Sequence, residues 1–247
     1  MSWALETSGL SKRFGGFVAT NDVSLAVAAG ARHALIGPNG AGKTTLINLL
    51  TGFLVPSAGS VRLNGEDVTH LAQHRRVKRG LARTFQINRL FDDMTVLESV
   101  VLAVCERLGL GARFFGAVGR RGEAIDAAAE ILSRLRLLDL AHQRTRDLAY
   151  GKRRLIEIAL ALAARPAVLL LDEPAAGVPR TESRELFETI AQLPDTVTIL
   201  LIEHDMDLVF RFADRISVLV AGAVLTEDTP AAIAADPRVR EVYLGHG

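Results

Sequence analysis

Eight consecutive residues have the types and the spacing that bind phosphate: Gly37, Pro38, Asn39, Gly40, Ala41, Gly42, Lys43 and Thr44. They match the pattern G-x-x-x-x-G-K-[S/T] at every fixed position. The glycines allow successive backbone N–H groups to turn toward an anion, and the N-terminus of a following helix adds partial positive charge. Lys43 is expected to reach the outer phosphates, and the Thr44 hydroxyl to ligate Mg²⁺. This phosphate loop predicts nucleotide binding.

Two acids follow a hydrophobic run in Leu171-Asp172-Glu173-Pro174. An acid that ends a buried strand is the expected second half of a phosphate-loop site. Asp172 would hold magnesium through a water, and Glu173 would orient and polarise the attacking water. Two adjacent acids could also form an ordinary turn, but the phosphate loop upstream favours the catalytic interpretation.

Two further polar residues occupy positions that can face a bound phosphate. His204 follows the hydrophobic run that ends at Ile202, and a side chain at the carboxyl end of a parallel strand faces the ligand crevice. It could hydrogen-bond the γ-phosphate, or belong to a helix cap opened by Asp205. Gln86 follows an expected strand, where its amide could touch both magnesium and the attacking water.

A third segment with anion-binding character spans Leu148, Ala149, Tyr150, Gly151 and Lys152 and continues to Arg154. A turn of small residues at a helix N-terminus is another anion site. The segment lies far along the chain from the phosphate loop, which suggests that it serves a second subunit.

These residues require an α/β scaffold to position them. Hydrophobic runs at residues 34–36, 168–171 and 197–202 predict buried strands of a parallel sheet, whereas residues 5–36 include short alternating segments typical of antiparallel strands. Residues 95–162 have helical periodicity. We expect one domain over residues 1–247.

Within that domain we expect three parts. Residues 1–86 and 166–229 would form the nucleotide-binding core together with an antiparallel β subdomain. Residues 87–165 would form a helical insertion, and residues 230–247 a short amphipathic tail.

Composition limits the class of protein. The 247 residues have a net charge of +1, so no overall charge attracts nucleic acid. The basic run at residues 74–79 is interpreted as a solvated helix face rather than a phosphate-binding patch. The single cysteine, Cys105, fits a reducing compartment. The longest apolar stretch, residues 155–171, is interrupted by charged residues and Pro166, so a membrane role would depend on partners.

The order and spacing of the phosphate loop, Gln86, Leu148–Arg154, Asp172-Glu173 and His204 resemble those of an ATP-binding-cassette ATPase. The resemblance covers essentially the whole chain and implies a P-loop NTPase fold with a RecA-like parallel core. Further similarity to the importer subunits for branched-chain amino acids lies in Arg13–Gly16, Arg83–Gln86, Leu148–Gly151, Glu173–Gly177 and Val242–Gly245. Urea, amide and hydrophobic amino-acid importers share these features, as do the ATPases of lipopolysaccharide export.

The resemblance implies a mechanism with several partners. Two ATPase subunits, paralogues or copies, would sandwich two ATP molecules, each held by one subunit's phosphate loop and the other's Leu148–Lys152-type segment. Two permease subunits and, indirectly, a periplasmic binding protein would complete an importer at the cytoplasmic face of the inner membrane. Phe14 would stack on adenine, with Val18 and Thr45 also binding nucleotide, and Mg²⁺ would be held by Thr44, Gln86 and Asp172.

Three residues depart from the pattern of the superfamily. Ala149 stands where the Leu-Ser-Gly-Gly-Gln segment has serine, and Lys152 where it has glutamine. Pro179 replaces a residue that is usually acidic or an amide, and its nitrogen cannot donate a hydrogen bond. We therefore hypothesise that the two ATP sites of the dimer are unequal.

Other functions predict different sequence features. A cassette protein acting on DNA or ribosomes would carry long coiled-coil insertions, and residues 87–165 show no sustained heptads. A small-molecule kinase would show an arginine-rich lid, and a GTPase an Asn-Lys-x-Asp motif, which the sequence lacks. Genes for a periplasmic binding protein and two permeases nearby would favour import over lipid export.

Overall fold

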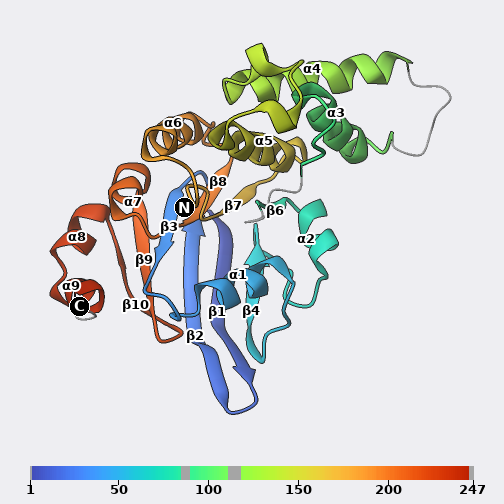
Figure 1. The fold of residues 1–247 in the computed structure, drawn as a ribbon. Helices are drawn as coiled ribbons and strands as arrows, with labels where there is room; N and C mark the ends of the chain where they lie inside the picture. Colours follow the sequence, from blue (N-terminus) through green and yellow to red (C-terminus); the bar gives the residue numbers. More distant parts are fainter. Residues whose placement is uncertain (1, 85–89, 111–117, 245–247) are drawn as a thin grey trace. The chain divides into compact units, whose positions relative to one another are not determined.

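Buried strands form the central sheet of the structure, a computed structural model that describes residues 2–84, 90–110 and 118–244. Every residue is buried in β3 (Arg32–Ile36), β7 (Val168–Asp172) and β8 (Thr198–Ile202). The sheet order is β10-β9-β3-β8-β7-β6 (Figure 1). The three other strands are β6 (Leu81–Arg83), β9 (Arg215–Val220) and β10 (Ala223–Asp228). The expected parallel core is therefore confirmed.

The order of these strands places the candidate residues at one edge of the sheet. β3 pairs in parallel with β8 and β9, β8 with β7, and β7 with β6, while β9 and β10 form an antiparallel hairpin. Since parallel strands end at the same edge, the segments that follow β3, β7 and β8 meet there.

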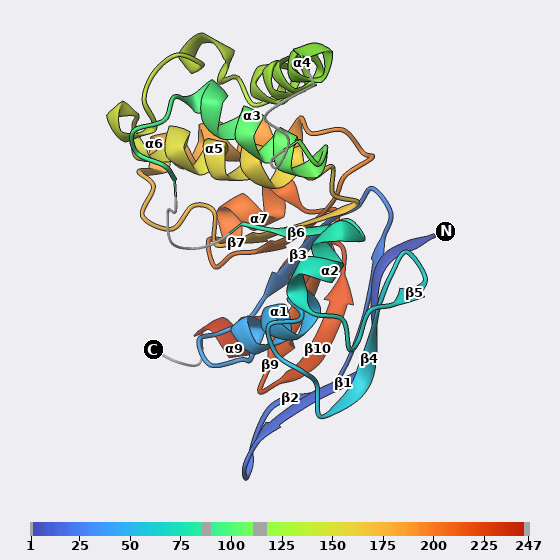
Figure 2. The same cartoon turned by 90° about the vertical axis from the view of Figure 1, so that its right-hand side faces the viewer.

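A second, antiparallel sheet has the order β2-β1-β4-β5 (Figure 2). Its strands are β1 (Trp3–Phe14), β2 (Phe17–Ala28), β4 (Ala58–Leu63) and β5 (Glu66–Asp67). Side chains from both sheets and from helix α1 (Lys43–Thr51) share one hydrophobic core. The two sheets and α1 thereby fix the phosphate loop from both ends.

The opposite face of β3 carries the C-terminal helices. Alternation along β3 sends Leu35 into the core shared with α1, and Ala34 and Ile36 into a second core. That second core includes residues of α7 (Met206–Phe212), α8 (Pro230–Ala235) and α9 (Pro237–Leu244). The strand before the phosphate loop is therefore covered on both faces.

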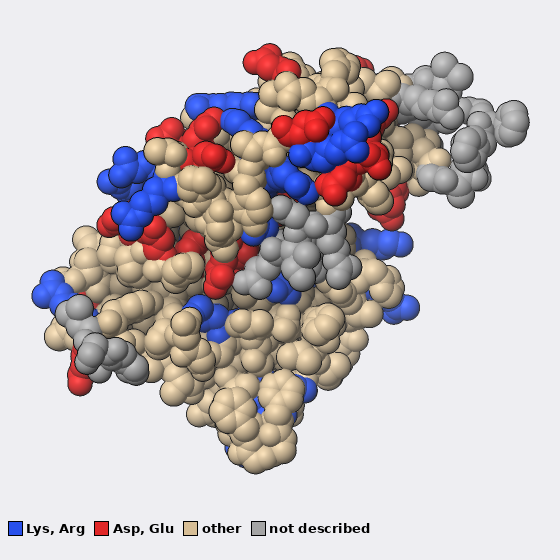
Figure 3. All heavy atoms as spheres, in the orientation of Figure 1, with Lys and Arg blue, Asp and Glu red and all other residues tan. Residues whose placement is uncertain are grey.

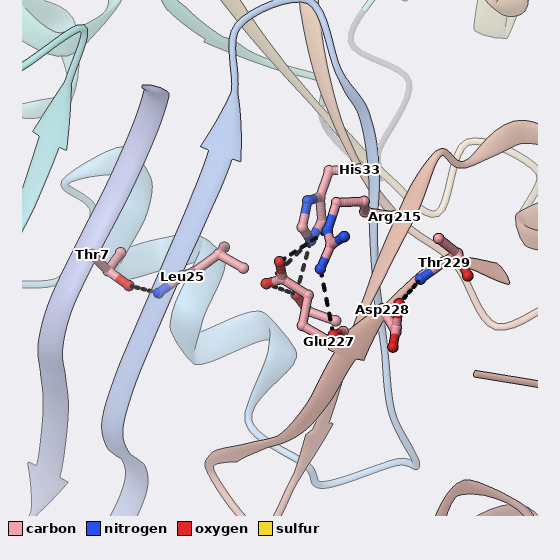
Figure 4. Close-up of polar contacts among 8 residues, drawn as sticks. Thr7, Leu25, His33, Arg215, Glu227, Asp228 and Thr229 are labelled. Carbon is pink, nitrogen blue, oxygen red and sulfur yellow. Dashed lines mark hydrogen bonds and ion pairs between the residues drawn. The ribbon is translucent and has the colours of Figure 1, made fainter. Parts of the chain in front are cut away.

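Polar side chains join β3, β9 and β10, and two of them, His33 and Ser217, are buried (Figure 4). His33 Nε2 lies 2.8 Å from Ser217 Oγ, which also donates to Glu227 Oε2 at 2.8 Å. Arg215 Nε donates to Glu227 Oε1 at 3.2 Å. Burial lowers the pKa of His33 to about 4, although Glu227 acts in the opposite direction.

The basic run at residues 74–79 is not uniformly solvated, contrary to the sequence interpretation. Helix α2 (Gln73–Lys78) buries Arg76, which is 1% exposed. Its guanidinium donates to four carbonyl groups, those of Leu49, Leu50, Thr69 and Leu71. Two of these carbonyls belong to the C-terminal turn of α1, where a cation also stabilises the helix dipole.

A separate compact unit consists of Thr84–Pro166 and Pro174–Leu193. It contains α3 (Val96–Arg107), α4 (Val118–Arg134), α5 (Tyr150–Ala163) and α6 (Arg180–Ala191), with short 3₁₀ turns at Leu138–Leu140 and Thr145–Asp147. The helical insertion was expected at residues 87–165, whereas this unit also includes α6, which was expected to belong to the core. Contacts between α5 and α6 account for this difference.

The remaining segments, Met1–Arg83, Ala167–Glu173 and Pro194–Gly247, form the sheet-containing unit. Among the described residues, no helix is both long and apolar enough to cross a membrane.

Lysine and arginine side chains are interspersed with acids over the helical unit (Figure 3).

Candidate functional site

The phosphate loop connects β3 to α1, the strand–loop–helix context that its motif requires. Gly42 is the N-cap of α1 and has a φ of 99°, a left-handed conformation that favours glycine. A Cβ on Gly42 would lie 2.4 Å from the carbonyl oxygen of Ala19. No side chain caps α1, so N–H groups of its first turn are oriented to receive an anion.

A cavity of about 310 Å³ opens over this loop. It is lined by Phe17, Ala19, Asn39, Gly40, Ala41, Gly42, Lys43, Thr44, Thr45 and Glu173. The lining therefore combines backbone and hydroxyl donors, one cation, one acid and one aromatic ring. This chemistry suits the phosphates and the base of a nucleotide.

Lys43 is held against the loop itself. Its Nζ donates to the carbonyl oxygens of Gly37 at 2.6 Å and of Pro38 at 3.1 Å. Burial lowers the pKa of Lys43, whereas the nearby charges of Glu173 and Asp172 raise it. The charges of both acids at the end of β7 therefore act on the lysine of the phosphate loop.

Asp172 ends β7 as a buried residue, and its carboxylate forms an ion pair with Arg83. Arg83 donates from its NH2 group to Asp172 Oδ2 at 2.6 Å, and from NH1 to Asn48 Oδ1 at 2.9 Å. Arg83 therefore links β7 to α1. The sequence analysis quoted Arg83 in a motif but gave it no role, because nothing local reveals which acid an arginine will meet.

Glu173 has a backbone conformation that sequence reasoning did not anticipate. Its φ is 48°, in the left-handed region that costs energy for a residue other than glycine. Its N–H donates to the carbonyl of Ile202 at 2.9 Å, which ties the end of β7 to β8. The side chain lines the cavity over the phosphate loop.

His204 follows β8, the strand between β3 and β7, and therefore lies at the expected edge. Its side chain is 66% exposed, and it does not line the cavity. The buried carboxylate of Glu203 accepts from the backbone N–H of His204 at 3.0 Å. Asp205 caps α7 through the N–H groups of Asp207 and Leu208. The structure is thus compatible with both roles considered for this segment, a contact of His204 with the γ-phosphate and a helix cap opened by Asp205.

An aromatic residue at the start of β2 lines the cavity. Phe17 has this position, and Phe14, which the resemblance expects to stack on adenine, is its partner across the β1–β2 turn. Phe14 lies under the ammonium group of Lys12, 5.3 Å from its ring centroid. Phe17 and Ala19 share one face of β2, whereas Val18 points to the other. Pairing and alternation could have identified Phe17 from the sequence.

The donor set suits magnesium rather than a metal held entirely by protein. The candidate ligands on described residues are the Thr44 hydroxyl in the loop and the Asp172 carboxylate at the end of β7. Over the described ranges, no cluster of three or more His, Cys, Asp or Glu side chains forms a metal cage. Mg²⁺ keeps waters and binds substrate phosphates alongside one or two protein ligands. Gln86, the third expected ligand, lies outside the described residues.

The Leu148–Lys152 segment, which we call the α5 segment, leads into the N-terminus of α5 in the helical unit. Ala149 is the N-cap and provides no side-chain hydrogen bond. The Tyr150 ring packs beside the Arg154 guanidinium, 5.2 Å from ring centroid to Cζ, and lies close to Gly177. Gly151 and Lys152 contact acids of α6. The segment retains the backbone N–H groups that the resemblance assigns to a partner's ATP.

Comparisons with known proteins agree with this geometry. A family model described as ABC transporter matches residues 20–176. A second model, described as branched-chain amino acid ATP-binding cassette transporter, matches residues 223–247. Together they cover the phosphate loop, both acids and the helices α8 and α9.

Individual relatives match over nearly their whole length. The high-affinity branched-chain amino acid transport ATP-binding protein BraF of Pseudomonas aeruginosa is 44% identical, over 98% of this chain and 97% of the relative. The corresponding protein LivG of Escherichia coli is 43% identical, with the same coverage. The crystal structure of the ADP conformation of an ATP-binding cassette of an ABC transporter is 32% identical, with a TM-score of 0.85, over 99% of both chains.

Proposed function

Since this chain belongs to the ABC transporter family, where it is an ATP-binding subunit, we propose that it hydrolyses ATP to drive uptake of branched-chain amino acids. The observation that supports hydrolysis best is the joint placement of the phosphate loop, Lys43 and Glu173 around one cavity. The substrate class follows from the relatives' names and from the match of residues 223–247.

Each residue of the site has a role in this proposal. Lys43 leaves the carbonyls of the loop and pairs with the β- and γ-phosphates, while the backbone N–H groups of the loop surround them. Thr44 and Asp172 would hold Mg²⁺, which would supply positive charge beside the transferred phosphoryl group. Glu173 orients and polarises the attacking water. His204 contacts the γ-phosphate, and Gln86 completes the magnesium and water contacts.

The site is one half of a functional ATP site. In our proposal the other half is the α5 segment of a second ATPase subunit, a paralogue or a copy. Two permease subunits and, through them, a periplasmic binding protein complete the importer. The chain would then lie on the cytoplasmic face of the inner membrane.

The substrate is tested by transport rather than by binding to this chain. The chain should be co-expressed with candidate permeases and a candidate binding protein from the same genome, and the complex reconstituted in vesicles. ATP-dependent uptake of leucine, but not of urea, is the expected result, and a Lys43→Ala chain should abolish it. Selective uptake of urea or an amide, or outward movement of a lipopolysaccharide, would instead support the two alternatives that the sequence left open.

A further inference from the structure

Helix α5 begins without a cap of its own. The first N–H groups of a helix lack intrahelical partners, and a Ser, Thr, Asp or Asn at the N-cap usually accepts from one of them. Here the N-cap is Ala149, which has no acceptor on its side chain. Some other group must therefore satisfy the N-terminal turn of this 14-residue helix.

The missing acceptor comes from α6. Glu182, in the first turn of α6, accepts through Oε2 from the backbone N–H of Gly151 at 3.0 Å. Gly151 is the second residue of α5, the position whose N–H an N-cap side chain commonly takes. A Cβ on Gly151 would lie 2.7 Å from that carboxylate oxygen, so a larger residue here would require the Glu182 carboxylate to shift.

A second acid of α6 holds the next residue. Lys152 Nζ lies 2.6 Å from Glu185 Oε1. Glu182 and Glu185 are three residues apart, so they lie on the same face of α6. Two consecutive residues of the α5 segment thus have carboxylates of α6 as partners.

These contacts have a consequence for phosphate binding. The N–H of Gly151 is one of the groups that the proposed function offers to the ATP of the partner subunit. The carboxylate of Glu182 competes with an incoming phosphate for this N–H and also repels it. The γ-phosphate must therefore displace Glu182 before it can use this donor.

We propose that Glu182 is a positioning residue that replaces the missing N-cap of α5 and releases the N–H of Gly151 to the partner's γ-phosphate. This inference rests on the proposed function, because it requires an ATP held between two subunits. α6 follows the loop that begins at Glu173. The exchange at Gly151 therefore connects the segment that carries Glu173 to the ATP that the partner subunit holds. The group that caps α5 thus lies on α6 rather than at position 149.

The first test needs no nucleotide and no partner. Hydrogen exchange at the Gly151 amide should be about fivefold faster in Glu182→Ala than in the wild type, the size expected for a lost helix cap. Adding Ala149→Ser to that variant should restore protection, because the serine hydroxyl accepts from the same turn. Glu188→Ala, an exposed acid on the same helix, is the matched control and should change nothing. Unchanged exchange in Glu182→Ala would overturn the capping role.

The second test uses the assembled transporter. In the variant that carries both Ala149→Ser and Glu182→Ala, the ATP concentration for half-maximal hydrolysis should fall severalfold, since a neutral hydroxyl replaces a competing carboxylate. If this ATP concentration is unchanged or raised, the proposal that phosphate displaces Glu182 from the Gly151 N–H is wrong. A wild-type transporter that hydrolyses no ATP would refute the proposed function and the exchange with it, while the capping result would stand.

Discussion

Among single residues, Lys43 has one set of partners in this structure and would have another when a nucleotide is bound. In this structure its ammonium group binds the carbonyls of Gly37 and Pro38, and two acids lie close enough to raise its pKa against the effect of burial. A triphosphate that carries magnesium offers stronger acceptors than these carbonyls. Nucleotide entry therefore exchanges one set of contacts for another around a preformed loop.

Phe17 gives a prediction at the same scale. Phe17→Ala should weaken ATP binding by about 1–3 kcal/mol, because an aromatic platform for the base is lost. Inorganic triphosphate has no base, so its binding should be unaffected. Titration calorimetry with both ligands, on this variant and on Phe14→Ala, separates the two aromatic residues.

Phe53→Ala is the control for the Phe17 prediction. Phe53 is 70% exposed and does not line the cavity, so its loss should leave both affinities unchanged. If Phe17→Ala weakens triphosphate and ATP equally, Phe17 shapes the loop and does not contact the base.

At the scale of elements, α1 is held at both ends. Its N-terminal turn faces the cavity, and its C-terminal carbonyls receive the buried guanidinium of Arg76. Burial lowers the pKa of Arg76 to about 10, which still leaves it charged at neutral pH. The helix that presents the phosphate-binding N–H groups thus depends on an arginine from α2.

Arg76→Ala should lower the free energy of unfolding by at least about 3 kcal/mol, because four buried carbonyls lose their donor. Urea denaturation measures this change. Arg75→Ala alters an exposed neighbour and should stay within about 0.5 kcal/mol of the wild type. Equal effects of the two substitutions would show that the buried contacts are not what stabilises α1.

His33 predicts a pH dependence for the packing of β3 against β9 and β10. Its folded pKa of about 4 lies below the ordinary value of 6.5, so only the unfolded chain binds this proton at intermediate pH. The stabilisation is complete above about pH 6.5 and is lost as the pH falls toward 4, by up to about 3 kcal/mol.

Free energies of unfolding measured between pH 4 and 7 test this dependence. His33→Gln should remove the part of the slope that histidine contributes, while His74→Gln, which alters an exposed histidine, should retain it. The same slope in all three proteins would exclude His33 as its source.

At the scale of the whole molecule, the sequence predicted what is encoded locally. The phosphate loop, the acids at the end of β7 and the parallel strands depend on short motifs and hydrophobic runs. Arg83, Arg76 and Glu182 were missed, because each finds its partner on another element and its residue type says nothing about which one. Phe17 was missed for a different reason, since the pairing of β1 with β2 was not used.

The molecule as a whole offers two candidate anion-binding surfaces, the phosphate loop in the sheet-containing unit and the α5 segment in the helical unit. Each provides donors for only part of an ATP molecule in the proposed dimer. The hypothesis that the two sites are unequal depends on Ala149. If Ala149→Ser alone leaves ATP hydrolysis by the intact transporter unchanged, that hypothesis loses its support.

The central claim is that this chain hydrolyses ATP through Glu173. The most direct measurement compares ATP hydrolysis by the assembled transporter with the wild-type chain and with Glu173→Gln, at ATP concentrations shown by binding to be saturating. We expect that the variant still binds ATP and traps a closed dimer, while turnover falls by at least about 100-fold. Normal turnover by Glu173→Gln would contradict it.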